Sequence, residues 1–250
     1  MTNLLRWEKP DIAVMTGDII SGYEWDGVTE GWYANNFENF TKAFYKTNTR
    51  YAITLGNHDS EGDLTRAEIN ELDRTYDLSL TQPSAEGVSH AFNYFLPVHD
   101  KDGVEERFRL WFLDSGDYDC MGVQGYGCVM PDQVEWLRAE ASKIDDDHVS
   151  KGRGFMFMHI PMQEYMNMYN FNQFYGHAGE TVCCSSLNTG LFSAIYEKNI
   201  CEWVSVGHDH NNEYYGQYHG IWLSFGRKTG YGQYGPEGIL RGARIFEVTQ

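Results

Sequence analysis

The segment that most constrains this chain is YAITLGNHD, residues 51–59, in which an apolar run stops at a Gly-Asn-His-Asp sequence. The run up to Leu55 has the length and composition of a buried parallel strand. Gly56 then lets the backbone turn sharply, so that three polar side chains follow the carboxyl end of the strand. Open α/β sheets bind their ligands at this edge. We therefore expect an α/β fold with its chemistry at the strand ends.

Three other apolar runs end in polar residues in the same way. They are residues 11–18 (DIAVMTGD), which end in Asp18, residues 154–161 (GFMFMHIP), which contain His159, and residues 201–210 (CEWVSVGHDH), which contain His208 and His210. Asp, Asn and His supply oxygen and imidazole ligands, which suit divalent first-row metals and need no thiolate. Four strand ends of this kind in one chain indicate a metal site.

The order of these motifs resembles that of the calcineurin-like metallophosphoesterases: GD, then GNHD, then a lone His after an apolar strand, then GHxH. The resemblance covers almost the whole chain. LDSGDY (113–118), HIPMQEY (159–165) and GHDHNNEYYG (207–216) are similar to the branch of Dcr2-type and purple acid phosphatase 29-like proteins. The resemblance implies an α-β-β-α sandwich, in which helices flank two sheets and two metals lie across the carboxyl ends of the strands.

The same resemblance implies two metal sites that share one carboxylate. Asp18 matches the bridging position, because the two oxygens of a carboxylate can each bind one cation. The other implied ligands are Asn57, His159 and His208 for the second metal and His210 for the first. In the purple members a tyrosine stands three residues after the bridging Asp, whereas Ser21 stands here, so we expect a colourless enzyme.

Catalysis is assigned by the resemblance to His58, which is not a ligand in this scheme. His58 would protonate the leaving alkoxide or stabilise the phosphoryl charge as imidazolium, and it would contact the substrate together with Asn57. Asp59 would orient the His58 ring by accepting its other N–H, or would cap the helix that follows; the sequence leaves both open. Residues 162–186 show little periodicity, and we expect a specificity lid there, with His177 as a candidate phosphate contact.

The beginning of the sequence departs from the family pattern. In the family a strand ending in Asp-x-His precedes the first helix and completes the first metal site. Here residues 1–9 have the pattern of an amphipathic helix that Pro10 stops, and no Asp-x-His occurs upstream of Asp18. We expect residues 1–250 to be a single domain that is N-terminally incomplete and lacks this strand, or else a protein that has lost half of one metal site.

The predicted function is a metal-dependent phosphoric-ester hydrolase, a phosphomonoesterase that uses a dinuclear centre and metal-bound hydroxide. The alternatives are a non-catalytic or single-metal relative with a binding role, and a phosphodiesterase. Fe, Zn and Mn all suit nitrogen and oxygen ligands. The metal and the oligomeric state stay open.

Net charge excludes one class of partner. At −17 the surface repels a nucleic-acid backbone, so the expected substrate is a small phosphate ester or a phosphoprotein. No apolar run of the length of a membrane span occurs. The first residues lack signal-peptide features, whereas Cys120 and Cys128 could bridge across a glycine-rich loop. A secretory and a cytoplasmic location both remain open.

Periodicity and turn residues predict the rest of the elements. We expect helices within residues 37–44, 64–77, 131–141 and 191–198, a hairpin formed by 89–98 and 108–113, and closing strands at 221–225 and 243–248. Residues 114–127 are a polar, glycine-dense loop that either lines the substrate pocket or is a turn. Residues 226–238 carry Arg227 and Lys228 but lack the glycine spacing of a phosphate loop, and we interpret them as a solvated turn.

Overall fold

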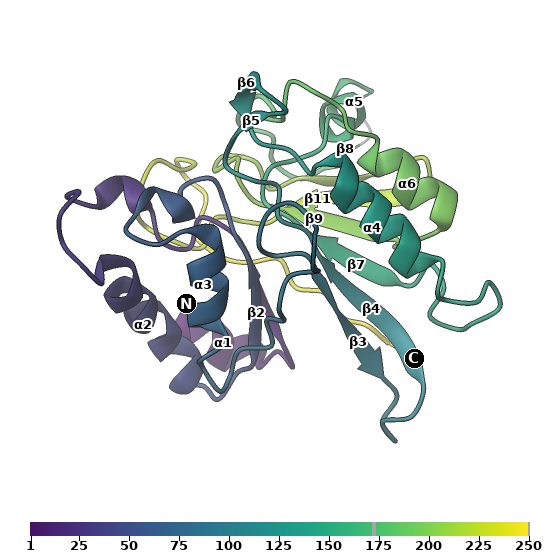
Figure 1. Cartoon of the computed structure of the whole chain (residues 1–250), viewed down its shortest axis with the longest axis horizontal. Coiled ribbons are helices and arrows are strands. Elements are labelled where there is room, and N and C mark those ends of the chain that lie inside the picture. Colours follow the sequence, from purple (N-terminus) through teal and green to yellow (C-terminus); the bar gives the residue numbers. More distant parts are fainter. Residues whose placement is uncertain (172–173, 250) are drawn as a thin grey trace.

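Two facing sheets form the centre of the computed structural model, which describes residues 1–171 and 174–249. The larger sheet has 7 strands in the order β3-β4-β7-β9-β11-β10-β8 (Figure 1). Strands β4, β7, β9 and β11 are parallel to one another, so their carboxyl ends meet at one edge. The strands are β3 (Tyr94–His99), β4 (Glu106–Phe112), β7 (Gly154–Phe157), β8 (Phe174–Tyr175), β9 (Trp203–Val206), β10 (Tyr215–Tyr218) and β11 (Ile221–Phe225).

The smaller sheet consists of β1 (Ala13–Thr16) and β2 (Tyr51–Thr54), which are parallel. Hydrogen bonds connect it directly to the larger sheet. The Thr54 hydroxyl donates to the Leu113 carbonyl at 3.0 Å, and the Tyr94 hydroxyl donates to the Ile53 carbonyl at 2.7 Å. The loops that follow β1 and β2 therefore come out beside those that follow the parallel strands of the larger sheet.

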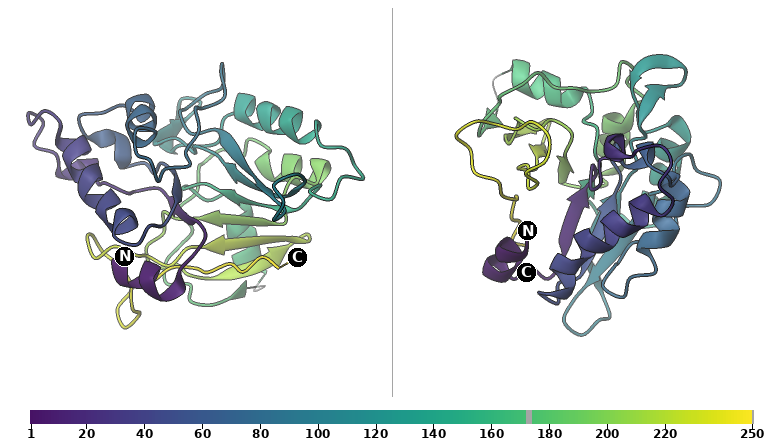
Figure 2. Two further views of the ribbon diagram at one scale, coloured as in Figure 1. Left: turned by 90° about the horizontal axis from the view of Figure 1, so that it is seen from below. Right: turned by 90° about the vertical axis from the view of Figure 1, so that its left-hand side faces the viewer.

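Helices cover the outer faces of both sheets, which gives the expected α-β-β-α layers (Figures 1 and 2). The helices are α1 (Thr2–Glu8), α2 (Trp32–Tyr45) and α3 (Arg66–Asp73) beside the smaller sheet, α4 (Pro131–Ala141) and α6 (Leu191–Lys198) on the larger one, and α5 (Glu164–Asn170), with short 3-10 helices η1 (Gly22–Glu24) and η2 (Asp59–Glu61). Among the described residues, no helix has the length and apolar character needed to cross a membrane.

Two hydrophobic cores lie on opposite faces of the larger sheet. Trp111 and Phe112 are adjacent in β4, and both are fully buried, Trp111 in the core under α4 and α6 and Phe112 in the core between the sheets. Successive strand residues point to opposite faces, which explains the continuous apolar run of this strand. In the core between the sheets Phe112 stacks on Tyr94 with ring centroids 4.5 Å apart.

A buried ion pair connects α3 to the loop after β4. Arg66 Nε donates to Asp114 Oδ2 at 3.0 Å, Nη2 bonds the other carboxylate oxygen, and Nη1 donates to the Gly56 carbonyl at 2.8 Å. The backbone N–H groups of Ala91 and Gly116 complete the shell of this carboxylate, each at 3.0 Å. One guanidinium thus fixes two strand-end loops relative to each other.

The helices and the hairpin agree with the sequence expectations, but three segments differ from them. Residues 243–248 do not form the expected strand. The Arg244 side chain donates to the Phe225 carbonyl at 2.9 Å and 3.0 Å, and Phe246 packs on Phe155. Side-chain contacts therefore hold this segment in place of the backbone hydrogen bonds of a strand. The expected lid at 162–186 contains α5 and β8, and its residues 172–173 lie outside the described residues. The single-domain assignment stays a prediction.

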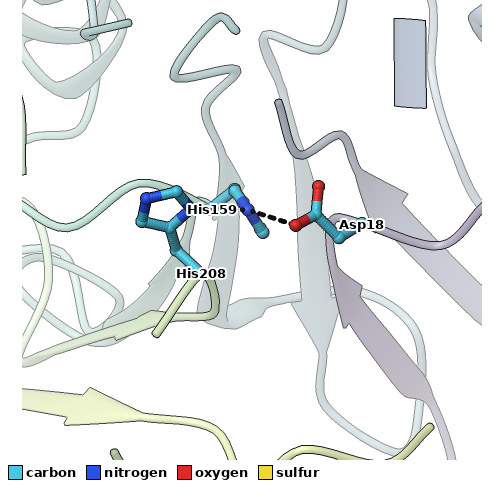
Figure 3. A group of neighbouring side chains, drawn as sticks. All are labelled: Asp18, His159 and His208. Carbon is cyan, nitrogen blue, oxygen red and sulfur yellow. Dashed lines mark hydrogen bonds and ion pairs between the residues drawn. The ribbon is translucent and has the colours of Figure 1, made fainter. Parts of the chain in front are cut away.

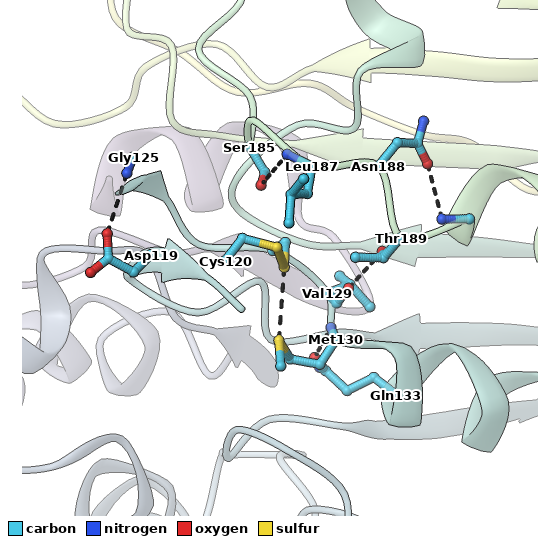
Figure 4. Close-up of a disulfide and its surroundings, with 12 residues drawn as sticks. Asp119, Cys120, Gly125, Val129, Met130, Gln133, Ser185, Leu187, Asn188 and Thr189 are labelled. Carbon is cyan, nitrogen blue, oxygen red and sulfur yellow. Dashed lines mark hydrogen bonds between the residues drawn. A yellow bond between two sulfur atoms is a disulfide. The ribbon is translucent and has the colours of Figure 1, made fainter. Parts of the chain in front are cut away.

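The third difference concerns residues 114–127, which form a small hairpin rather than an irregular loop. Its strands are β5 (Tyr118–Cys120) and β6 (Val123–Tyr126). A disulfide joins Cys120 to Cys128 across a Cα separation of 5.4 Å (Figure 4). The bridge connects the hairpin to the segment before α4 and so limits how far the hairpin can move.

Replacing Arg66 by Met tests the buried ion pair. The change leaves the Asp114 carboxylate buried without its cation, so we expect the free energy of unfolding at pH 7 to fall by about 3–5 kcal/mol, measured by urea unfolding. The matched change Arg107→Met removes an exposed pair with Glu105 and should cost less than about 1 kcal/mol. Equal losses in the two variants would contradict this role.

The same pair makes a pH prediction. Burial alone would raise the pKa of Asp114, but Arg66 outweighs burial and holds that pKa below its usual 3.8. The carboxylate therefore contributes stability in full above pH 3.8, and this contribution is lost as the pH falls through the lower pKa of the folded state. The difference in stability between wild type and Arg66→Met should shrink in acid. A difference that stays constant from pH 7 to pH 3 would contradict the assignment.

Candidate metal centre

The loops after β1 and β2 approach each other more closely than side chains would allow. A Cβ on Gly56 would lie 2.1 Å from Asp18 Oδ1, and a Cβ on Gly17 would lie 2.3 Å from the Gly56 nitrogen. Gly17 also has φ +92°, which only glycine adopts readily. Asp18 itself has φ 49°, a conformation that is uncommon for residues other than glycine and recurs at functional sites. The two glycines thus bring Asp18 beside the Gly-Asn-His-Asp segment.

Asp59 holds these two loops together. Its fully buried carboxylate accepts hydrogen bonds from the backbone N–H groups of Ile19 and Ile20 at 3.0 Å, from that of Gly56 at 2.8 Å, and from the Tyr33 hydroxyl at 3.0 Å. Neither of the two contacts expected of Asp59 is present in the described structure, because Glu61 bonds the His58 ring and no side chain caps η2. Asp59 lies on the inner side of the loop, where it bonds backbone amides, and it has a positioning role.

Four potential ligand atoms meet at His159 Nε2, and Figure 3 shows three of the side chains that carry them, Asp18, His159 and His208. His159 Nε2 lies 3.1 Å from Asp18 Oδ2, 3.2 Å from Asn57 Oδ1 and 3.2 Å from His208 Nδ1. The other ring nitrogen, Nδ1, lies 2.7 Å from the Thr16 carbonyl and must donate to it. When the ring is neutral, Nε2 carries a lone pair, and Asp18 Oδ2, Asn57 Oδ1 and His208 Nδ1 are the other potential ligand atoms around it.

A metal ion fits this arrangement better than a proton does. One N–H on His159 cannot serve three acceptors in different directions, whereas ligands about 2.1 Å from one cation lie about 3.0–3.4 Å from each other. Asp18, His159 and His208 each place a ligand atom within 4.8 Å of the others. His159 is also oriented as metal-binding histidines usually are, with its second nitrogen on a backbone carbonyl.

The electrostatics favour a cation at this point. Without an ion, burial lowers the pKa of His159, but the Asp18 carboxylate outweighs burial, raises this pKa and favours the protonated ring. Burial and the charge of this ring lower the pKa of His208 to about 3, so His208 stays neutral and able to act as a ligand, and a cation would take the place of the proton on His159 Nε2. Burial would raise the pKa of Asp18, but His159 and the His58 backbone N–H outweigh it and keep the carboxylate ionised. His208 Nε2 is buried without a hydrogen-bond partner among the described residues, and the His208 and Tyr126 rings are nearly perpendicular, with centroids 4.3 Å apart. The His208 backbone, like that of Asp18, has a left-handed conformation, with φ 69°.

A hydrogen-bond chain that the sequence did not predict orients Asn57 and His58. Asn57 Nδ2 donates to the Tyr118 hydroxyl at 3.2 Å, which turns Oδ1 of the same amide toward His159. The Tyr118 hydroxyl donates to Glu61 Oε1 at 2.9 Å, and Glu61 Oε2 lies 2.7 Å from His58 Nδ1. Glu61, not Asp59, is therefore the partner of the His58 ring. Tyr118 belongs to the disulfide-linked hairpin, so residues 114–127 contact the centre.

The other candidate residues lie outside this cluster. His210 Nδ1 lies 2.9 Å from the Tyr234 carbonyl, and the His210 and Tyr234 rings stack with centroids 4.1 Å apart. As in His159, one ring nitrogen of His210 therefore bonds a backbone carbonyl. This contact also shows that residues 226–238 pack on the site and are not merely a solvated turn. His177 is exposed beside Asn212, and its carbonyl accepts from the Glu213 N–H at 2.9 Å. Its role as a phosphate contact stays a prediction.

Comparisons with known proteins agree with this geometry. Residues 1–212 match the family model described as calcineurin-like phosphoesterase. The chain is 29% identical over 99% of its length to a probable inactive purple acid phosphatase 29 of Arabidopsis thaliana, and 29% identical over 84% of its length to phosphatase DCR2 of Saccharomyces cerevisiae. It spans 67% of the first protein and 38% of the second. These relatives are those that the branch resemblance led us to expect.

A solved structure shows the same fold. The crystal structure of a dimetal phosphatase from Danio rerio superposes with a TM-score of 0.60 at 15% identity, over 90% of this chain and 75% of that one. At this identity the likeness supports the arrangement of sheets and helices only.

Loss of the ligands should abolish metal binding. Loss of a group that hydrogen-bonds to a metal ligand lowers metal affinity about 10–100-fold. We expect Asp18→Ala and His208→Ala, which remove ligands themselves, to lower the affinity for Mn²⁺ or Zn²⁺ by more than this. Isothermal titration measures this affinity. The control is His99→Ala, because His99 is an exposed residue of the edge strand β3. Wild-type affinity in either ligand variant would contradict the proposed centre.

Tyr118→Phe tests the chain that orients Asn57. The change removes one hydroxyl and leaves the ring, so we expect metal affinity to fall about tenfold or more because the amide is free to turn. Tyr231→Phe is the matched control, since that side chain is 86% exposed. If Tyr118→Phe and Tyr231→Phe bind Zn²⁺ equally well in the same titration, Tyr118 does not orient the ligand.

Proposed function

The chain belongs to the calcineurin-like phosphoesterase family, and on this premise we propose that it is a metal-dependent phosphomonoesterase. The observation that carries the proposal is the meeting of Asp18, Asn57 and His208 around His159 Nε2 at 3.1–3.2 Å. These residues come from four strand ends that the fold brings to one edge. His58 lies directly beside them, with its backbone N–H donating to Asp18 Oδ1 at 3.0 Å.

The four side chains would hold one divalent ion, which when bound supplies positive charge to the phosphoryl oxygens and lowers the pKa of water. A second ion would use His210, whose Nδ1 bonds the Tyr234 carbonyl and whose Nε2 is then the ligand atom. The family's phosphoester hydrolysis gives the reaction class. Substrate and metal identity belong to the proposal.

His58 is the residue that we assign to proton transfer. Its ring is 37% exposed, so a substrate can reach it, and Glu61 bonds Nδ1 at 2.7 Å. With Nδ1–H donated to the carboxylate, Nε2 is the atom that carries a proton to the leaving oxygen. Glu61 also accepts from Tyr118, so the position of the ring depends on the hairpin. General acid catalysis of this kind contributes about 10²–10⁴-fold in rate.

A second candidate function is metal binding without turnover. The plant relative is named a probable inactive phosphatase, whereas the yeast relative is named a phosphatase. In this chain the cluster brings together ligands for one ion, and His210 lies apart on Tyr234. One ion would stabilise the bound phosphate less than two, which favours the binding role.

Hydrolysis of p-nitrophenyl phosphate by metal-loaded protein tests the proposal. We expect turnover with Mn²⁺, Zn²⁺ or Fe²⁺, and a fall in kcat of about 10²–10⁴-fold in His58→Gln with unchanged metal content. Faster hydrolysis of bis(p-nitrophenyl) phosphate would show a phosphodiesterase. Bound metal with no turnover of either ester would favour the second candidate and contradict the first.

A further inference from the structure

One short motif of the sequence has no place in the metal centre. Asn39-Phe40-Thr41 is an Asn-x-Thr tripeptide, and no other Asn-x-Ser or Asn-x-Thr occurs in the chain. In proteins that enter the secretory pathway, such a tripeptide is the acceptor of an N-linked glycan. Tripeptides of this kind also occur by chance. The meaning of this one depends on where the fold places the asparagine and on the compartment in which the chain folds.

The fold places Asn39 on the outer surface of the protein. Asn39 lies in α2, whose buried residues Tyr33, Phe37 and Phe44 belong to the core between the sheets. Asn39 is exposed, as is Asn35 one helical turn before it, so both lie on the face of α2 that points away from this core. Figure 1 shows α2 in the outer layer beside the smaller sheet. A sugar attached to Asn39 would therefore extend into solvent.

The hydrogen bonds of the Asn39 amide are compatible with an attached sugar. Nδ2 donates to the Asn35 carbonyl at 3.0 Å, and Oδ1 accepts from Lys42 Nζ at 2.7 Å. The amide nitrogen carries two hydrogens, and a glycan replaces only one of them. The bond to Asn35 can therefore remain after attachment. Both contacts are exposed, so the modification removes no buried hydrogen bond.

The other end of the motif determines when a glycan can be attached. The Thr41 side chain is 1% exposed, and its hydroxyl donates to the Glu38 carbonyl at 2.9 Å. A transferase that recognises this hydroxyl cannot reach it once α2 has folded. Attachment must therefore precede the folding of this helix, which is the order of events when a chain is glycosylated as it enters the endoplasmic reticulum.

The disulfide is a second and independent observation. Cys120 and Cys128 are paired, and both are buried. Disulfides form and persist in oxidising compartments such as the lumen of the endoplasmic reticulum, whereas cytosolic thiols are kept reduced. N-linked glycans are attached in this same lumen. Two unrelated features, one on α2 and one in the β5–β6 hairpin, thus indicate the same compartment.

We propose that the chain folds in the secretory pathway and carries an N-linked oligosaccharide on Asn39. In the transfer, Asn39 Nδ2 forms a bond to C1 of the first sugar of an oligosaccharide held on a lipid pyrophosphate. The bond between C1 and the pyrophosphate oxygen breaks, the lipid pyrophosphate leaves with the electron pair, and Nδ2 loses one proton. The exposed face of α2 holds none of the residues that we assign to the metal centre, so this inference does not depend on the proposed function.

Mass spectrometry of the protein isolated from the cells that make it tests the proposal directly. We expect the peptide that contains Asn39 to carry N-acetylhexosamine and hexose. Treatment with peptide N-glycosidase should remove the sugar and convert the Asn39 amide to a carboxylate. The same digest should show Cys120 linked to Cys128. An unmodified Asn39 would overturn the glycan, and free thiols at the two cysteines would contradict the compartment.

Cell-free translation with microsomes of the endoplasmic reticulum tests the motif without any requirement for a stable fold. The full chain is placed behind a signal peptide, and the glycan is detected as a shift in gel mobility that endoglycosidase H reverses. We expect this shift in the wild type and its loss in both Asn39→Gln and Thr41→Val, the second of which keeps the asparagine.

The matched control is Asn35→Gln. Asn35 is also exposed on α2, but Phe37 stands where the motif needs Ser or Thr, so this variant should show the same shift as the wild type. Absence of the shift in the wild type would overturn the proposal. A shift that persists in Asn39→Gln would do the same, because the sugar would then be attached elsewhere.

Discussion

The structure depends on the close contact between the two loops that follow β1 and β2. Gly17 and Gly56 allow their backbones to touch, and the buried Asp59 carboxylate joins them by accepting amide hydrogens from both. Burial and the nearby Asp18 raise the pKa of Asp59, so two acidic groups are held close together in the interior. This arrangement is unfavourable in the protein alone, and a cation on the outer side of Asp18 would relieve it.

Around this contact, each further element places one polar group. The inter-sheet hydrogen bonds place β7 so that His159 meets Asp18, and β9 brings His208 with a left-handed backbone. The disulfide-linked hairpin then contributes Tyr118, which turns the Asn57 amide.

The sequence predicts the elements and the ligands more completely than the groups that orient them. Apolar runs that stop at Gly17 or Gly56 identify strands because both the strand and its end are local properties. Glu61 and Tyr118 could not be found in this way, since their roles depend on a contact 57 residues apart in the chain. The strand expected at residues 243–248 fails for a related reason, because Arg244 and Phe246 attach that segment through side chains.

The central claim is that one metal ion binds between Asp18, Asn57, His159 and His208. Anomalous X-ray diffraction from crystals grown with Zn²⁺ or Mn²⁺ tests it most directly, because the anomalous signal locates the ion without reference to activity. The account predicts a peak within about 2.0–2.3 Å of Asp18 Oδ2 and His159 Nε2. Clear density for the four side chains with no anomalous peak among them would contradict it.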